Sequence, residues 1–148
     1  MPSIIPGYVY TLFASIIVGT LIISMCGLSI ANVKHEAEEQ QLSNIASYVA
    51  AKGIELVSQA GADNLTLSVA LDVPSAVGNQ RYWIKLQNDS SNAWVETGYG
   101  NTALSSEQRA SIPAEIAASG VYISGSGIAF IEYTLNSSGA FLSLNGGI

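Results

Sequence analysis

The feature that most constrains this chain is an apolar run that meets a charge cluster without a break. Residues 1–33 contain no charged side chain. Charged or titratable residues then fill all but one of the next six positions: Lys34, His35, Glu36, Glu38 and Glu39. Because neither proline nor glycine separates the two regions, we expect one helix to pass from an apolar environment into an aqueous one.

The apolar run is long enough to cross a membrane. Ten of the 20 residues at 9–28 are Leu, Ile, Val or Phe, which together favour insertion by about 3 to 6 kcal/mol. About 20 apolar residues span a bilayer core of about 30 Å. A cleaved secretory signal fits less well, because no Lys or Arg precedes position 34 and the run exceeds a typical signal core. Pro2, Pro6 and Gly7 place the expected helix start near Gly7.

A helical period resumes after the charge cluster. Apolar and small residues recur every three or four positions, on one face of a helix: Leu42, Ile45, Val49, Gly53, Leu56 and Ala60. With Gly61 as a stop signal, the predicted helix runs from about residue 7 to about residue 60 and is about 80 Å long. Its first part is apolar on all sides and needs lipid or other copies around it. Its second part needs a domain to cover one face, and we expect Leu42, Ile45, Val49 and Leu56 to pack there.

The remainder of the chain has the alternation of half-buried strands. Strands are expected within residues 64–73, 81–87, 93–100, 120–124, 128–136 and 140–145. In between, Ser105 with Gln108 resembles a capping box, and one or two helical turns or a loop are expected there. The sequence therefore predicts an α+β chain: an N-terminal helix in 1–61, and in 62–148 a small antiparallel β-sheet or β-sandwich head that packs on the helix.

The reactive residues do not assemble into a catalytic or metal site. His35 is the only histidine and Cys26 the only cysteine. The three glutamates beside His35 could hold a metal ion, but a solvated collar at the end of the apolar run explains them more simply. Cys26 behaves as a small apolar residue, with palmitoylation or an intermolecular disulfide as alternatives. Glu96 and Glu132 are the remaining pair for acid–base chemistry. We expect neither enzyme activity nor a cofactor.

Charge and local motifs suggest where the head lies. The net charge of −6 leaves no basic patch, so nucleic-acid binding is not expected. Asn-X-Ser/Thr sequons supply candidate N-glycosylation sites at Asn64, Asn88 and Asn136. If these sites are used, the head lies outside the cell.

The segment GYVYTLFASIIVGTLIISMCGLSIANVKHEAEEQQLSNIASYVA before a β-rich head resembles an archaeal type IV pilin or archaellin-like subunit. The resemblance covers the whole layout of the chain. Family precursors carry a short basic leader that a prepilin peptidase removes. No Lys or Arg precedes Gly7, so either Met1 is the mature N-terminus or the chain is not a processed pilin. Ile5 stands where many bacterial pilins have a glutamate.

This resemblance implies a structural subunit of an extracellular filament at the cell surface, with adhesion or surface attachment as its role. Subunits would wait in the cytoplasmic membrane and then polymerise with other copies of the same chain, heads outward and often glycosylated. The residues expected in the filament core are Leu12, Phe13, Ile16, Ile17, Gly19, Leu21, Ile22, Ile23, Gly27 and Leu28. The alternative is a single-pass membrane-anchored protein whose extracytoplasmic β-domain binds a partner.

Overall fold

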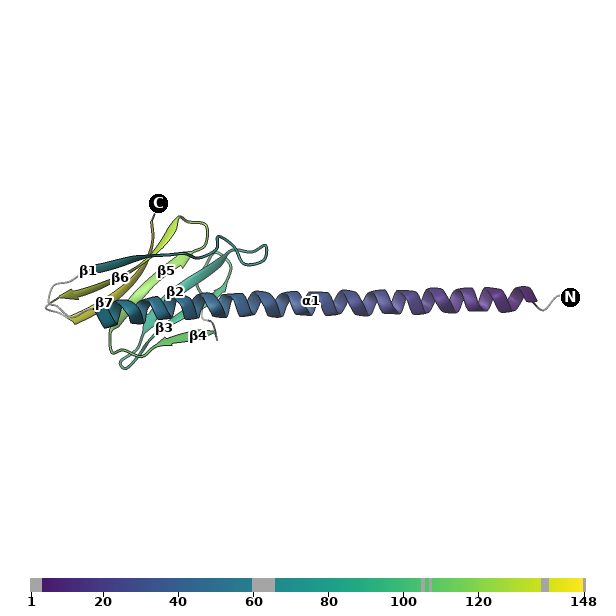
Figure 1. Ribbon diagram of the computed structural model, residues 1–148, viewed down its shortest axis with the longest axis horizontal. Coiled ribbons are helices and arrows are strands. Elements are labelled where there is room, and N and C mark those ends of the chain that lie inside the picture. Colours follow the sequence, from purple (N-terminus) through teal and green to yellow (C-terminus); the bar gives the residue numbers. More distant parts are fainter. Residues whose placement is uncertain (1–3, 60–65, 105, 107, 137–138, 148) are drawn as a thin grey trace. The chain divides into compact units, whose positions relative to one another are not determined.

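A computed structural model describes residues 4–59, 66–104, 106, 108–136 and 139–147. Its contacts divide the chain into two compact units, residues 1–37 and 38–148. The long helix α1 (Ile4–Gln59) supplies every described residue of the first unit and continues into the second (Figure 1). The predicted fold class, a long N-terminal apolar helix followed by a small and mostly antiparallel β head, is confirmed.

The charge cluster does not interrupt α1. Residues 34–39 are all helical, because Lys, Glu and Ala are good helix formers and no proline or glycine intervenes. The helix begins at Ile4, slightly earlier than the predicted start at Gly7. Pro6 is tolerated there because the amide N–H groups of a first helical turn have no intrahelical partner to lose.

The strands described in the head form one sheet, in the order β1-β6-β7-β5-β2-β3-β4. Their bounds are β1 (Thr66–Leu71), β2 (Tyr82–Asn88), β3 (Ala93–Tyr99), β4 (Arg109–Ile112), β5 (Ala117–Ile123), β6 (Ile128–Asn136) and β7 (Gly139–Gly147). Neighbouring strands are antiparallel except β5 and β7, which are parallel. Of the two predicted forms of the head, the described strands adopt the single sheet.

Strand β4 corrects one prediction. Ser105 of the expected capping box lies outside the described residues, and the described residues 104, 106 and 108 form no helix. The following residues, Arg109–Ile112, pair with β3 as an edge strand that the expected turns or loop did not include. Its inward-facing residues Ala110 and Ile112 alternate with outward-facing Arg109 and Ser111. Four residues are too few for this alternation to stand out in the sequence, and β3 provides the hydrogen bonds that fix it.

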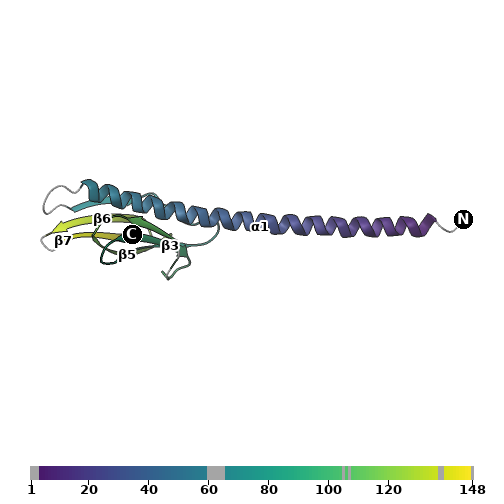
Figure 2. The same cartoon turned by 90° about the horizontal axis from the view of Figure 1, so that it is seen from below.

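The head core lies between one face of the sheet and the second part of α1, which runs along that face in Figure 2. The helix contributes Leu42, Ile45, Val49 and Leu56, all of which are buried. The sheet contributes the alternating residues Tyr82, Ile84 and Leu86, among others. Burial of each large apolar side chain contributes roughly 1.5–3 kcal/mol, which explains why the amphipathic part of α1 belongs to the head.

At Gly53, α1 packs tightly on the side chains of the sheet. A Cβ atom at this position would lie 3.0 Å from Ile112 Cδ1 and 3.2 Å from Leu142 Cδ2. The glycine therefore lets side chains from two strands pack directly against the helix backbone. In addition, the Thr97 hydroxyl donates a hydrogen bond of 3.3 Å to the carbonyl oxygen of Leu42 and so ties β3 to the helix.

The other face of the sheet, here called the outer face, is turned away from α1 and is partly covered by its own aromatic side chains. Trp83 is only 2% exposed because its indole packs on Gly98, where a Cβ atom would come within 2.5 Å of the ring. Its indole N–H donates to the carbonyl oxygen of Tyr99 at 3.2 Å. Trp83 is therefore fixed in the head rather than presented to a partner.

Candidate functional site

The apolar part of α1 is uncovered. The large apolar residues predicted for a filament core are between 53% and 72% exposed: Leu12, Phe13, Ile16, Ile17, Leu21, Ile22, Ile23 and Leu28. Gly19 and Gly27 have no atom within 4 Å of an added Cβ, apart from their own helix backbone and chain neighbours. By length and composition this helix could cross a membrane. Water is an unfavourable solvent for so much apolar surface, so this segment must be covered by lipid or by protein.

The serine and threonine hydroxyl groups within this segment are already satisfied. Each donates to a backbone carbonyl three or four residues earlier, at 2.8–3.3 Å: Thr11, Ser15, Thr20, Ser24 and Ser29. A hydroxyl moved from water into an apolar medium without a partner costs roughly 1–3 kcal/mol in proteins. Because these hydroxyls keep their partners within the helix, the segment can enter lipid or a protein core without that cost.

The charged residues 34–39 at the end of the apolar segment form no metal-binding cluster. Among the described residues, no group of three or more His, Cys, Asp or Glu side chains could hold a metal ion. His35 and the glutamates beside it lie on consecutive turns of α1. Cys26 is a free and exposed thiol on the apolar segment.

On the outer face of the head, a buried carboxylate joins two strands. Glu96 in β3 is 1% exposed, and its Oε1 atom accepts hydrogen bonds from Arg109 Nε and Trp94 Nε1, each at 2.9 Å. The Arg109 guanidinium also lies over the Trp94 ring, 5.3 Å from its centroid. The other carboxylate oxygen, Oε2, is buried without a hydrogen-bond partner among the described residues. Glu96 therefore holds Trp94 and Arg109 in fixed positions.

Glu96 and Glu132 do not form an acid–base pair. Strands β7, β5 and β2 lie between β6, which carries Glu132, and β3, which carries Glu96. At about 4.8 Å per strand, this places the two carboxylates about 19 Å apart. Sequence reasoning missed the cluster that Glu96 does form, because only the β3–β4 register places Arg109 opposite it.

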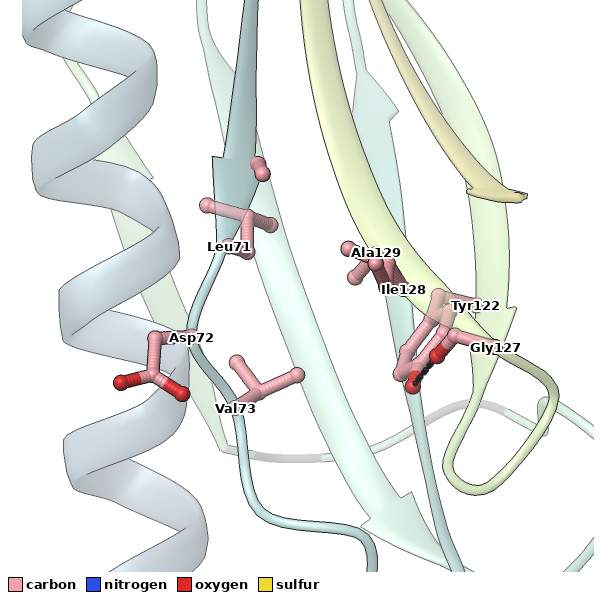
Figure 3. A pocket seen from close by; sticks show the side chains of 8 residues that line it. Leu71, Asp72, Val73, Tyr122, Gly127, Ile128 and Ala129 are labelled. Carbon is pink, nitrogen blue, oxygen red and sulfur yellow. Dashed lines mark hydrogen bonds between the residues drawn. The ribbon is translucent and has the colours of Figure 1, made fainter. Parts of the chain in front are cut away.

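A hollow of about 330 Å³ opens between the end of β1 and the start of β6 (Figure 3). Figure 3 shows Leu71 and Val73 on one side of it and Tyr122 on the other. The Tyr122 hydroxyl donates to the carbonyl oxygen of Gly127 at 2.9 Å, which leaves it no free proton to donate. Asp72 is the one carboxylate among the residues that line the hollow.

The glycosylation candidates lie at different places. Asn64 is outside the described residues. Asn88 is exposed, but its amide is engaged: Nδ2 donates to the carbonyl oxygen of Asp89 at 3.1 Å, and Oδ1 accepts from the Ala118 amide at 3.0 Å. Asn136 is exposed at the end of β6.

No protein-family model, curated protein or solved structure matches this chain. The fold and the candidate surfaces therefore define it as an α+β protein with an uncovered apolar helix of membrane-spanning length.

Proposed function

We propose that this chain is the structural subunit of an extracellular type IV pilus-like filament, which polymerises through its N-terminal helix and carries its heads outward. The observation that supports this proposal most is the exposed apolar segment of α1 with its internally satisfied hydroxyls. Such a segment suits both environments that a pilin meets, lipid before assembly and a bundle of helices afterwards. The unassembled subunit would reside in the cytoplasmic membrane and the polymer at the cell surface.

Assembly exchanges lipid contacts for helix–helix contacts. Since lipid tails are as apolar as leucine, the hydrophobic effect does not drive this exchange, and close packing must do so. Gly19 and Gly27 lie on an exposed helix surface with open space around them. A neighbouring helix could approach closely at both positions, which is how small residues favour association in an apolar medium.

The head suits exposure to the exterior. Its described core is complete without the apolar segment, and charged residues are only 11% of the chain. A glycan at Asn136 would project from an exposed strand end. Adhesion or surface attachment is the role we assign to such a filament.

The alternative function is a single-pass membrane anchor for an extracytoplasmic binding domain. The length and composition of α1 favour it equally, because a helix that fits a bilayer needs no further copies. The two functions differ in oligomeric state, which electron microscopy can resolve.

The test is to remove detergent from the purified full-length chain and to image the product by negative-stain electron microscopy. We expect uniform filaments from the unaltered chain. Gly19→Leu should abolish or strongly reduce them, because an added Cβ at Gly19 meets no atom outside the local helix backbone and the larger side chain would hold a neighbouring helix away. Ile23→Leu keeps the side-chain volume and is the control that should still polymerise.

Two results would contradict the proposal. One is an unaltered chain that gives only discrete particles dispersed by detergent or lipid, which would favour the membrane anchor. The other is sheared cell-surface fibres that lack this chain by mass spectrometry. If Gly19→Leu polymerises as well as the unaltered chain, the proposed close packing of neighbouring helices at Gly19 is wrong.

A further inference from the structure

Very little chain separates the apolar segment of α1 from the head. Val33 is the last residue before the charged positions, and Glu38 follows it five helical residues later. At about 1.5 Å per residue, the two residues are about 7.5 Å apart along the helix. The headgroup layer on each side of a bilayer core is about 5–8 Å thick. When residues 7–33 occupy the core, Glu38 therefore lies at the depth of the lipid headgroups.

A turn of the head packs directly on Glu38. In the connection from β1 to β2, Val77 and Gln80 close this turn with two backbone hydrogen bonds, each of 3.1 Å. Gly78 within it has φ +61°, and a Cβ atom added there would overlap the carboxylate of Glu38. Gly78, Asn79 and Gln80 are exposed. Since the Glu38 side chain touches the turn, the turn reaches the same depth as Glu38.

Two further loops lie beside this turn. The Arg81 carbonyl oxygen accepts a hydrogen bond of 2.9 Å from the amide of Gly100, where the β3–β4 connection begins. The Tyr82 carbonyl oxygen accepts one of 2.8 Å from the amide of Ser124, where the β5–β6 turn begins. The three loops therefore form one surface, here called the proximal end of the head, made up of residues 73–81, 100–104 and 124–127.

Arg81 is the one charged residue of the proximal end. Its side chain is exposed, and the guanidinium makes no ion pair or hydrogen bond with the described part of the chain. Its Nε atom lies 3.9 Å from a Cβ atom added at Gly125, so the side chain lies over the β5–β6 turn. Leu104 in the β3–β4 connection is 66% exposed. The proximal end thus combines an unpaired cation, an exposed apolar side chain and otherwise uncharged residues.

We propose that the proximal end of the head binds the surface of the lipid bilayer that α1 crosses. The Arg81 guanidinium suits a headgroup phosphate, because its planar fork of donors matches the phosphate oxygens. Leu104 leaves water for the boundary between headgroups and acyl chains. Since α1 holds this surface beside the membrane, the contact forms at a high effective concentration and needs little affinity of its own. The inference rests on insertion of α1, which the filament subunit before assembly and the membrane anchor share.

The charges at this depth indicate the class of lipid. Residues 34–39 contribute one lysine and three glutamates, with the histidine neutral, and Arg81 adds one positive charge. The sum is −1 (two cations less three anions), so an anionic surface is repelled on balance. A zwitterionic headgroup fits better, because it offers a phosphate to Arg81 and an ammonium group to the carboxylates.

The experiment measures contact between the proximal end and lipid in the full-length chain. The chain with Cys26→Ala and Asn79→Cys carries a fluorophore at position 79 and is inserted into nanodiscs of phosphatidylcholine. A small fraction of the lipid bears a nitroxide in its headgroup, and we expect it to quench this fluorophore strongly. Ser90→Cys, labelled in the same way, is the matched control, because Ser90 lies beyond the opposite end of β2, about 20 Å away. It should be quenched at least threefold less.

Arg81→Gln tests the role of the cation. In the chain labelled at position 79, it should lower the quenching by half or more. Lys85→Gln removes the same charge from the sheet and should leave the quenching unchanged. Replacing half of the phosphatidylcholine with anionic phosphatidylglycerol should also lower the quenching, and an increase there would overturn the assignment of the lipid class. Far-ultraviolet circular dichroism of each variant verifies that the fold is retained.

Insertion of α1 is measured separately, by labelling Cys26 in the otherwise unaltered chain and quenching it with a nitroxide on the acyl chains. Quenching at position 79 no stronger than at position 90, in a chain whose Cys26 label is quenched, would overturn the inference alone. Equal quenching with and without Arg81→Gln would show that the tether sets the proximity and that this surface does not bind lipid. An unquenched Cys26 label would contradict insertion, and with it the membrane stage of the proposed function.

Discussion

At the scale of single residues, a few positions accept only one side chain because the backbone around them is fixed. Gly120 in β5 has φ +143° and lies between two paired strands, β2 and β7. A Cβ atom there would come within 2.1 Å of the carbonyl oxygen of Leu144. That oxygen belongs to a strand backbone and cannot move away without breaking the β5–β7 pairing.

We therefore predict that Gly120→Ala lowers the free energy of unfolding by about 3 kcal/mol or more. Gly100 is the matched control, since its φ of +108° is also left-handed but an added Cβ would meet nothing within 4 Å. Gly100→Ala should cost only about 1–2 kcal/mol of backbone strain. Urea unfolding followed by tryptophan fluorescence measures both, and equal costs would show that the contact with Leu144 is unimportant.

Tyr82 gives a prediction about pH. Burial raises the pKa of its phenol well above the ordinary value, with a smaller contribution from Tyr122, and its hydroxyl donates to the carbonyl oxygen of Pro74 at 2.6 Å. The folded state therefore prefers the neutral phenol. The resulting stability is fully present below the pKa of the unfolded chain and is lost as pH rises toward the folded-state pKa.

In an alkaline titration followed by tyrosinate absorbance, we expect Tyr82 to ionise only when the head unfolds. Tyr82→Phe should remove one phenol from this late-ionising class. Ionisation of Tyr82 while the head stays folded would contradict the assignment.

At the scale of elements, α1 changes role along its length while its secondary structure stays the same. Its second part is amphipathic and depends on the sheet for its apolar face. Leu56 is 2% exposed in the head core, whereas Ile54, two residues earlier, is 40% exposed on the other side of the helix. Substitutions at these two positions therefore distinguish the contribution of core packing from that of the helix propensity of each residue.

We predict that Leu56→Ala destabilises the head by about 3 kcal/mol, because it removes buried methyl groups and leaves a cavity. Ile54→Ala is the control on the same helix and should cost less than about 1 kcal/mol, partly offset by the better helix propensity of alanine. Thermal unfolding of the two variants tests this difference. Similar costs would mean that the face of α1 assigned to the core is wrong.

At the scale of the whole molecule, the two compact units differ in the solvent that they need. Residues 38–148 contain the described hydrophobic core of the head. By contrast, the large apolar side chains described in residues 7–37 are all exposed. The need for lipid, detergent or sister copies should therefore reside in the first unit alone.

A chain shortened to residues 38–148 should accordingly be soluble without detergent, fold cooperatively and remain monomeric. Size-exclusion chromatography and circular dichroism test this, with the full-length chain in detergent as the reference. Aggregation of a well-folded shortened chain would place an assembly surface on the head. Failure to fold would show that the head depends on the apolar segment.

Much of this organisation was predictable from local patterns. The hydrophobic run, the resumed helical period after the charge cluster, and the alternation in Tyr82, Ile84 and Leu86 each depend on neighbours a few positions apart. Such periodicity determines which elements form and which side of each is apolar. It also identified Leu42, Ile45, Val49 and Leu56, which the structure places in the head core.

The sequence by itself thus determined the long helix, most of the strands and their buried faces, because these depend on short-range spacing. Only the tertiary structure decided the strand order, the parallel β5–β7 pair, the edge strand β4 and the cluster of Glu96 with Arg109 and Trp94. These features join residues that are distant in the chain. Their positions follow from which strands pair, and hydrogen bonds between strands leave no periodic signal in the sequence.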